Sequence, residues 1–472
     1  MPRINVFGVG LEARSSYISA KRMVNMLAEP RPSGEKSGIV GFRTPGLVLF
    51  ADAGMSPARG AAQYEKNGRA YCVILNAIYE ITGPGSLVNR GTLLTNGGRV
   101  SMACGFSQVM VVDGTYGYIL NTTTNVFTQI VAAGFPANPT TVTFCNGHFV
   151  VSTRDSSRFN VSAQDDGLTW NALDFANAES SSDPIVAVWA NGGQLVLFGT
   201  RTTEYWGASG AADFPFSPIQ GVASEWGLAS PWSLAKFDNT VAGLFHNRMG
   251  QVMVASLNGY LPKRISTPDV DFLINRYVNL SVASGYSYMA AGHSLYALNF
   301  PQDGTGDGFS WMFDQLSGMW SEIKSNSITR HRANFGVLFN DDVILFDYAN
   351  GKIYTPSTLA YTDNGEQLVA TLVTQTTAQA DLSRFTVNQF RMDVETGESS
   401  ASVLNPELAV EVSRDNGRTW GAPLSHPLGP AGVYWRYPNF ARLGTARNFV
   451  FRVTVSDPVP FTLVSACINP DD

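Results

Sequence analysis

The stretch "SRDNGRTW" carries the sharpest local motif of the sequence. It matches the Asp-box pattern S-x-D-x-G-x-T-W. It supplies Ser413, Asp415, Gly417, Thr419 and Trp420. In such a hairpin the Asp carboxylate accepts backbone N–H bonds across the turn, the Gly takes a positive φ and the Trp packs beneath. These residue types therefore predict a structural turn.

A second, weaker copy of the pattern lies in "SAQDDGLTW". Asp165, Gly167, Thr169 and Trp170 occupy their motif positions, but Ala163 stands where Ser is expected. The motif resembles the Asp boxes of sialidases and related propellers, where the box is structural and lies away from the catalytic centre. We interpret both copies as structural.

Other patterns do not indicate an active site. A glycosidase needs two opposed carboxylates, and Glu204 and Asp314 are no better candidates than other acids. A sialidase-type site needs an arginine cluster and a Tyr–Glu pair, and no spacing singles one out. Nucleotide-binding and nucleophile-elbow motifs are absent from the sequence. Five histidines occur without metal-site spacing: His148, His246, His293, His331 and His426. We expect no enzyme, and we assign no catalytic, cofactor-binding or metal-binding residue.

Three further features have two interpretations each. "RHR", from Arg330 to Arg332, is interpreted as a solvated strand end, with a basic binding spot as the alternative. The aromatic run Gly306 to Ile323 predicts blade core, with a stacking platform for sugars or bases as the alternative. The four cysteines lack CxxC spacing, which favours free thiols in a reducing cytosol over pairing: Cys72, Cys104, Cys145 and Cys467.

Composition narrows the class of protein. The chain has 472 residues, of which 44% are hydrophobic and only 15% charged, with 45 Gly. This favours an all-β protein with tight turns over a helix bundle or a disordered chain. The net charge of −6 argues against tight nucleic-acid binding. No run is long and apolar enough for a membrane helix, and "MPRINVFGVG" lacks the features of a signal peptide.

A repeat organises the middle of the chain. Strand–turn–strand units, many with Gly, Asn or Asp turns, recur about every 40 to 50 residues, the length of a four-stranded blade. They begin at Gly68, Ser107, Asn146, Asn191, Gly243, Gly292 and Asn340. We expect a β-propeller of six or seven blades over residues 51–365; the number stays open because the first or last unit can complete a blade split between two chain ends. Residues 366–472 alternate as an antiparallel β-sandwich does, and residues 1–50 form an extended N-terminal arm.

A family resemblance gives these domains a role. The stretches "RMVNMLAEP", "FRTPGL", "GRVSMA" and "TTEYWGASG", together with the ending "LGTARNFVFRVTVSDPVPFTLVSACI", occur in this order. They resemble signposts of the packaged-DNA stabilization proteins of short-tailed bacteriophages (podoviruses), which form the tail hub or nozzle. The resemblance implies a homohexamer in the virion, assembled in the bacterial cytoplasm. It also implies contacts with the portal and adaptor proteins of the head-to-tail connector and with the tail needle or tail spike and fibre proteins.

The resulting hypothesis is a structural protein without catalytic activity. It retains packaged double-stranded DNA, which passes through the lumen during ejection without tight binding, and it has no membrane partner. The arm is expected to close the first blade or to reach a neighbouring subunit. The alternative is a carbohydrate-binding or glycan-cleaving propeller of the phage tail or host surface, and a weaker one is a generic scaffold for protein partners.

Overall fold

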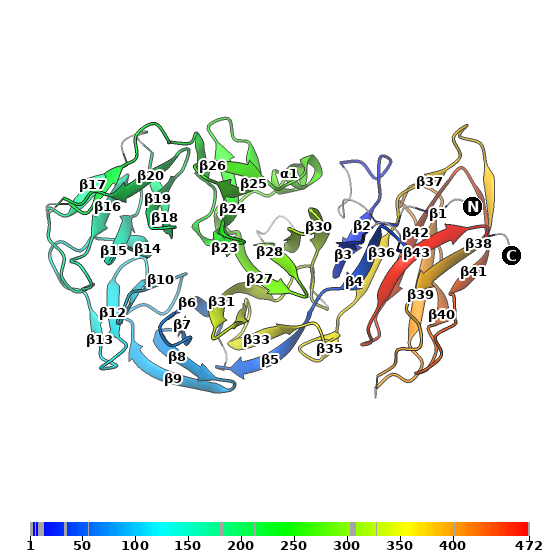
Figure 1. Ribbon diagram of the computed structural model, residues 1–472, viewed down its shortest axis with the longest axis horizontal. Coiled ribbons are helices and arrows are strands. Elements are labelled where there is room, and N and C mark those ends of the chain that lie inside the picture. Colours follow the sequence, from blue (N-terminus) through cyan, green and yellow to red (C-terminus); the bar gives the residue numbers. More distant parts are fainter. Residues whose placement is uncertain are drawn as a thin grey trace.

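A computed structural model shows a ring of small sheets joined to a two-sheet sandwich (Figure 1). The structure describes residues 3–4, 6–7, 14–32, 35–54, 56–178, 181, 183–211, 214–302, 308–326, 328–400 and 402–470. Helices are few and short in this part of the chain: α1 (Pro268–Ile274) and the 3₁₀ turns η1 (Pro231–Ser233) and η2 (Leu280–Val282).

The ring is a β-propeller with seven blades in the described residues. Blade 1 contains β6 (Ala58–Gln63), β7 (Ala70–Ile74), β8 (Ala77–Gly83) and β9 (Ser86–Thr92); blade 2 contains β10 (Ser101–Cys104), β11 (Gln108–Val112), β12 (Gly117–Asn121) and β13 (Phe127–Gln129); blade 3 contains β14 (Pro139–Cys145), β15 (His148–Thr153), β16 (Arg158–Val161) and β17 (Phe175–Asn177); blade 4 contains β18 (Ile185–Asn191), β19 (Gln194–Gly199), β20 (Thr203–Ala208) and β21 (Phe216–Pro218).

The remaining three blades vary this plan. Blade 5 contains β22 (Trp226–Leu228), β23 (Ala235–Phe237), β24 (Thr240–Asn247), β25 (Val252–Asn258) and β26 (Leu261–Arg264); blade 6 contains β27 (Ser284–Ala290), β28 (His293–Phe300), β29 (Phe309–Asp314) and β30 (Met319–Glu322); blade 7 contains β31 (Ala333–Phe339), β32 (Asp342–Asp347), β33 (Lys352–Ser357) and β5 (Gly46–Asp52), extended by β34 (Thr362–Asp363) and β35 (Glu366–Gln367).

Each pair of neighbouring blades has its own hydrophobic core, so seven apolar clusters hold the ring together. Blades 1 and 2, for example, bury Tyr71 against Val109, and blades 7 and 1 bury Phe346 with Cys72. Burying one large apolar side chain stabilises by about 1.5–3 kcal/mol. The seven repeat units of the sequence correspond to the seven blades, which confirms the propeller and fixes its blade number.

The sandwich packs two antiparallel sheets face to face around one further core. Its strands are β36 (Ala370–Val373), β37 (Thr377–Ala378), β38 (Phe385–Val394), β39 (Glu407–Ser413), β40 (Leu424–Pro427), β41 (Asn439–Ala446), β42 (Asn448–Val455) and β43 (Thr462–Ile468). Four strands of the N-terminal segment join them: β1 (Arg3–Ile4), β2 (Arg22–Val24), β3 (Met26–Pro30) and β4 (Ile39–Arg43). The C-terminal β-sandwich expected from the sequence is confirmed.

The N-terminal segment is shared between the two domains. Strands β1 and β4 pair with β43, and β2 pairs with β36, whereas β5 pairs with β33 of blade 7. The expectation that the arm closes the first blade is therefore wrong, because its strand completes the last one. The divided blade that the repeat allowed for is blade 7. The domain ranges 1–50, 51–365 and 366–472 stay predictions.

Strand β2 makes one continuous sheet of blade 6 and half of the sandwich. It pairs in parallel with β30 on one side and antiparallel with β36 on the other, giving a ten-stranded sheet. Figure 1 shows β2, β3 and β4 at this junction. Arg22 reinforces the pairing with a bidentate ion pair to Glu322, with N–O distances of 2.6 and 2.5 Å.

Asn25 fastens the same joint from inside. It is buried, with a φ of 52°, and lies between β2 and β3. Its amide nitrogen donates to the carbonyls of Lys324 and Val369, both at 2.9 Å, and its amide oxygen accepts from the Lys324 N–H at 2.9 Å. One side chain thus ties the N-terminal segment to the end of blade 6 and to the entry of the sandwich.

Replacement of Asn25 tests this joint. Asn25→Ala leaves three partly buried backbone groups without their partner and keeps a Cβ at positive φ, so we expect the free energy of unfolding to fall by about 3 kcal/mol in urea titration. Asn25→Gly removes the bonds but relieves the φ constraint, and should be less damaging by about 1 kcal/mol. The exposed Asn125, with a φ of 58°, is the matched control. Equal losses in N25A and N125A would contradict the assignment.

Candidate functional site

The Asp box of the sandwich forms the turn that its residues predict. One carboxylate oxygen of Asp415 accepts from the Thr419 N–H at 2.9 Å and from Ser413 Oγ at 2.7 Å, and the other accepts from Thr419 Oγ1 at 2.6 Å. These hydrogen bonds, led by that of Thr419, lower the pKa of Asp415 to about 2. Gly417 has a φ of 85°, as expected.

This turn holds part of the N-terminal segment. A Cβ on Gly417 would lie 2.6 Å from the Cβ of Ala20, so only glycine permits the contact. Trp420 packs on the cluster that contains Ala20, and the Arg452 guanidinium carbon lies 4.4 Å from the centre of a Trp420 ring. The box therefore serves as a docking turn for the chain leading into β2.

The second box, in blade 3, uses a different carboxylate from the one that the pattern assigns. Asp166 accepts from the Leu168 N–H at 3.0 Å and from Thr169 Oγ1 at 2.6 Å. Asp165 instead takes a φ of 55° and donates its backbone N–H to the Gly147 carbonyl at 2.7 Å. The assignment of Asp165 as the box carboxylate is wrong. The aspartate that accepts the turn hydrogen bonds, Asp166, stands one residue nearer to its threonine than Asp415 does in the first box.

Two single substitutions separate these aspartates. Asp166→Asn weakens the acceptor of two turn hydrogen bonds, so we expect a loss of about 1 kcal/mol in unfolding free energy. Asp165→Asn keeps a residue type that tolerates positive φ and should change it by less than about 0.5 kcal/mol. Urea unfolding of both proteins measures the difference. A larger loss in D165N than in D166N would restore the assignment made from the pattern.

The two acids weighed as glycosidase residues lie in different blades. Glu204 is on β20 of blade 4 and Asp314 is at the end of β29 in blade 6, and both are buried. Asp314 accepts from Ser317 Oγ at 2.6 Å and contacts His293 Nδ1 at 3.0 Å. The structure does not bring these two carboxylates together as an opposed pair.

His293 connects blade 6 to the N-terminal segment. Its Nδ1 lies 3.0 Å from Asp314 Oδ2, and its Nε2 lies 3.7 Å from Glu29 Oε2 on β3. The hydrogen bond to Asp314 is the main cause that raises the pKa of His293, and burial opposes it. The His293 imidazole thus lies between two carboxylates from different parts of the chain, which favour its protonated form.

This arrangement predicts a pH dependence. Because the folded-state pKa of His293 is raised above its ordinary 6.5, its stabilising effect is complete below pH 6.5 and is lost as the pH rises through the raised pKa. We expect His293→Gln to remove this loss of stability on the alkaline side, measured by urea unfolding between pH 6 and 9. His426→Gln is the control, since the partners of His426 are uncharged: its Nδ1 lies 2.9 Å from the Pro427 carbonyl and its ring packs against Phe440. A wild-type pH profile unchanged in H293Q would contradict the role.

The stretch "RHR" is buried, so its interpretation as a solvated strand end is wrong. Arg330 and His331 are 5% and 9% exposed, and Arg332 forms ion pairs of 2.8 Å with both Asp363 and Glu366. Burial lowers the pKa of His331 to about 4. The chain passes here between blades 6 and 7, where a short polar run has to enter the interior.

The aromatic run behaves as expected of a blade core: Trp311, Phe313 and Trp320 belong to the cluster between blades 5 and 6. The four cysteines are free thiols. Burial raises the pKa of Cys72 to about 12 and that of Cys145 to about 11, which makes both unreactive at neutral pH. The described residues contain no group of three or more side chains suited to hold a metal ion.

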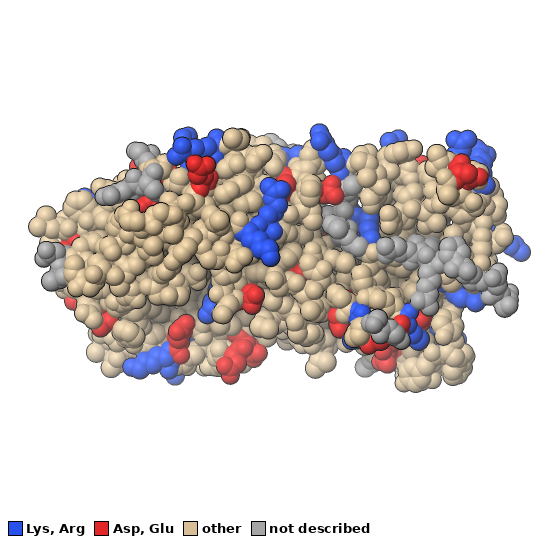
Figure 2. Space-filling view, turned by 45° about the horizontal axis from the view of Figure 1, so that its top comes forward, with Lys and Arg blue, Asp and Glu red and all other residues tan. Residues whose placement is uncertain are grey.

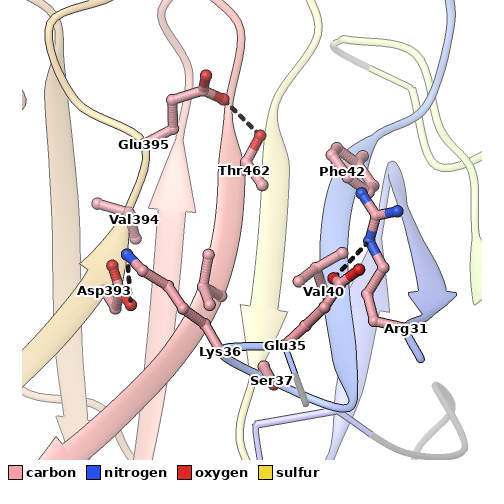
Figure 3. A pocket seen from close by; sticks show the side chains of 11 residues that line it. Arg31, Glu35, Lys36, Ser37, Val40, Phe42, Asp393, Val394, Glu395 and Thr462 are labelled. Atoms are coloured by element: carbon pink, nitrogen blue, oxygen red, sulfur yellow. Dashed lines mark hydrogen bonds and ion pairs between the residues drawn. The ribbon is translucent and has the colours of Figure 1, made fainter. Parts of the chain in front are cut away.

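A groove of about 610 Å³ lies between the β3–β4 hairpin and the ends of β38 and β43 (Figure 3). Its charged side chains contact partners within the chain. Lys36 lies 3.6 Å from Asp393, Arg31 lies 3.6 Å from Glu35, and Glu395 accepts from Thr462 Oγ1 at 2.5 Å. The groove therefore joins the N-terminal segment to the sandwich.

An exposed aromatic loop between β40 and β41 was missed at the sequence level. Tyr434, Trp435 and Tyr437 are 68%, 73% and 54% exposed. The loop is held at its base, where the Gly432 N–H donates to the Gly397 carbonyl at 3.1 Å. Its signal is the stretch "VYWRY", whose aromatic residues do not alternate with polar ones as in a strand. Trp, Tyr and Arg are the residues enriched in the energetic centres of protein interfaces.

Charge on the surface is sparse. On the face shown in Figure 2, basic and acidic side chains lie in small separate groups on a mostly uncharged surface. Among the described residues, no helix is long and apolar enough to span a membrane.

Two family models match the chain. One, described as bacteriophage P22 Gp10, beta-propeller, covers residues 4–358, and the other, described as bacteriophage P22 Gp10, beta-sandwich, covers residues 371–470. The chain belongs to the bacteriophage P22 Gp10 family. Gp10 is the tail hub or nozzle protein of short-tailed phages, so the family and all-β fold expected from the sequence are confirmed. This Gp10-family chain is a structural component of the phage tail.

Solved structures show lower similarity to this Gp10-family chain. The extracellular domain of the hybrid two-component system BT4673 from B. thetaiotaomicron is 10% identical, with a TM-score of 0.44, and the match covers 66% of this chain and 40% of that one. The computationally designed Ika8 protein is 12% identical, with a TM-score of 0.39, over 75% of this chain and 100% of that one. A comparison with curated proteins finds no match.

Proposed function

We propose that this protein forms the nozzle of a short-tailed phage, as six copies below the portal and adaptor, where it retains packaged DNA and forms part of the ejection channel. The observation that carries the proposal is the pair of Gp10 family matches over residues 4–358 and 371–470. The protein acts without catalysis and joins the virion in the bacterial cytoplasm.

The joint between propeller and sandwich supports this role. A plug against packaged DNA has to transmit force between its contacts without yielding. The two domains share the ten-stranded sheet that runs through β2, and the hydrogen bonds of the buried Asn25 connect them further. A flexible linker would not provide that stiffness.

The charge supports passage of DNA without tight binding. The net charge of −6 disfavours the release of counterions that drives binding to phosphates. Double-stranded DNA therefore slides through the lumen, and the seal is mechanical.

The aromatic loop supplies a contact for other tail proteins. Trp435 and its neighbours project from the sandwich with an arginine among them, which is the composition of an interface centre. We propose that this loop contacts the adaptor of the head-to-tail connector. Other surfaces then contact the needle and the spike or fibre proteins.

The test is DNA retention in particles assembled without this protein. We expect heads to package normally and then to lose their DNA on purification, so that the fraction of filled heads falls at least tenfold. Expression of the protein from a plasmid in the same infected cells should restore filled heads. Heads that stay full without it would overturn the nozzle role.

A variant separates attachment from folding. Trp435→Ala should leave thermal unfolding unchanged but reduce incorporation into particles and retention of DNA. Met249→Ala is the control, because Met249 is 87% exposed on a turn of blade 5, far from the loop in the sequence. Equal incorporation of W435A and M249A would refute the contact while leaving the nozzle role to the deletion experiment.

A further inference from the structure

One arginine reaches across the opening that the inner strands of the propeller enclose. Arg99 lies just before β10, at the start of blade 2. Its guanidinium carbon is 4.6 Å from the ring centre of Phe335 on β31 in blade 7, and 4.9 Å from that of Trp232 in η1 of blade 5. Blades 2 and 5 are not neighbours in the ring, so the side chain spans the central opening.

Among the described residues, none forms a hydrogen bond with the Arg99 side chain there. Its Nε is buried and unpaired, and within the described part of the chain no carboxylate forms an ion pair with it. The residue as a whole is partly exposed, so its terminal nitrogens are the part that solvent reaches. A guanidinium normally uses its five N–H donors on carboxylate, phosphate or carbonyl oxygens.

Arg59, on β6 of blade 1, is an arginine of the ring whose donors have partners. It donates to the carbonyls of Thr95, Gly97 and Gly98 at 2.8, 2.5 and 2.7 Å. It also donates to the Leu75 carbonyl and to Thr95 Oγ1. These bonds fix the loop that leads directly into Arg99, so the unpaired guanidinium is held in place by a rigid support.

A second cation lies near the first. Arg330 is 5% exposed and donates to Asn334 Oδ1 at 3.1 Å, with its guanidinium 4.4 Å from the Tyr348 ring centre. Burial, and then the charge of Arg330, lower the pKa of Arg99 to about 10, so Arg99 remains protonated at pH 7. The charge of Asp347 acts on Arg330, whereas the charge that acts on Arg99 is the like charge of Arg330. Aromatic rings compensate a partly buried cation only in part, so Arg99 still lacks an anion.

We propose that Arg99, assisted by Arg330, binds a small oxyanion of the phosphate or carboxylate class in the central opening of the propeller. The planar guanidinium, clamped between Trp232 and Phe335, offers its N–H groups to two oxygens of one ligand. The preformed loop reduces the entropy lost on binding. The site is independent of the DNA-retention role.

Thermal unfolding of the full chain at pH 7 tests the site, with phosphate, succinate and chloride as sodium salts at equal ionic strength. We expect the midpoint of the wild-type protein to rise by about 2 °C or more in phosphate or succinate relative to chloride, because a ligand that binds only the folded state stabilises it. A response to phosphate alone identifies a phosphate ligand, and an equal or larger response to succinate identifies a carboxylate.

Arg99→Gln should lose this response. In chloride we expect R99Q to be at least as stable as the wild type, because a partly buried cation without an ion-pair partner has been removed. This measurement also shows that the variant folds. Arg276→Gln is the matched control, since Arg276 is exposed and lies 6.0 Å from the Phe272 ring centre. It should respond to the anions as the wild type does. No anion effect above chloride, or the same effect in R99Q, would overturn the proposal.

Discussion

The pairing of β2 between β30 and β36 is the constraint on which the rest of the molecule depends. The three residues of β2 join the outer edge of blade 6 to an edge of the sandwich in one sheet. Neither edge is therefore left open to pair with another chain. Asn25, in the left-handed region, then redirects the backbone so that β3 enters the opposite sheet of the sandwich. Met23 and Met26, on either side of it, both pack in the sandwich core, whereas Leu27 packs against blades 6 and 7.

This topology pairs the first part of the chain with strands that lie far along the sequence. Strand β5 pairs with β33, about 300 residues later, and β4 pairs with β43. Such contacts are expensive in loop entropy and form late. Ring closure and domain docking are therefore coupled, because both use the same 50 residues. The polar links added by His293 to Glu29 and by Arg43 to the Leu368, Asp457 and Val459 carbonyls act after that docking.

The sequence predicts what depends on local pattern and misses what depends on long-range pairing. Seven hairpins with Gly, Asn and Asp turns define the seven blades because each blade is a local unit. The partners of the N-terminal strands follow from no periodicity, so the repeat allowed for a divided blade but did not identify β5 as the strand that closes blade 7. Composition was equally misleading for Arg330 to Arg332, which look solvated but meet Asp363 and Glu366 from a distant segment. In the box of blade 3, adjacent aspartates left the choice to backbone geometry, and φ assigns Asp165 to the turn and Asp166 to the hydrogen bonds.

The few charged residues explain how a large, weakly charged protein keeps a single structure. Arg43 and Arg59 are buried against backbone carbonyls, and Arg332 against two acids, so each fixes the place where separate segments meet. Apolar contacts alone specify a joint poorly, because they have no direction, whereas a guanidinium with several fixed acceptors permits one arrangement. Charge placed at internal joints in this way leaves the face seen in Figure 2 mostly uncharged, as a protein needs when large areas are to be covered by other subunits. Arg99 departs from this rule: its place in the ring is that of a joint, but its acceptor has to come from outside the chain.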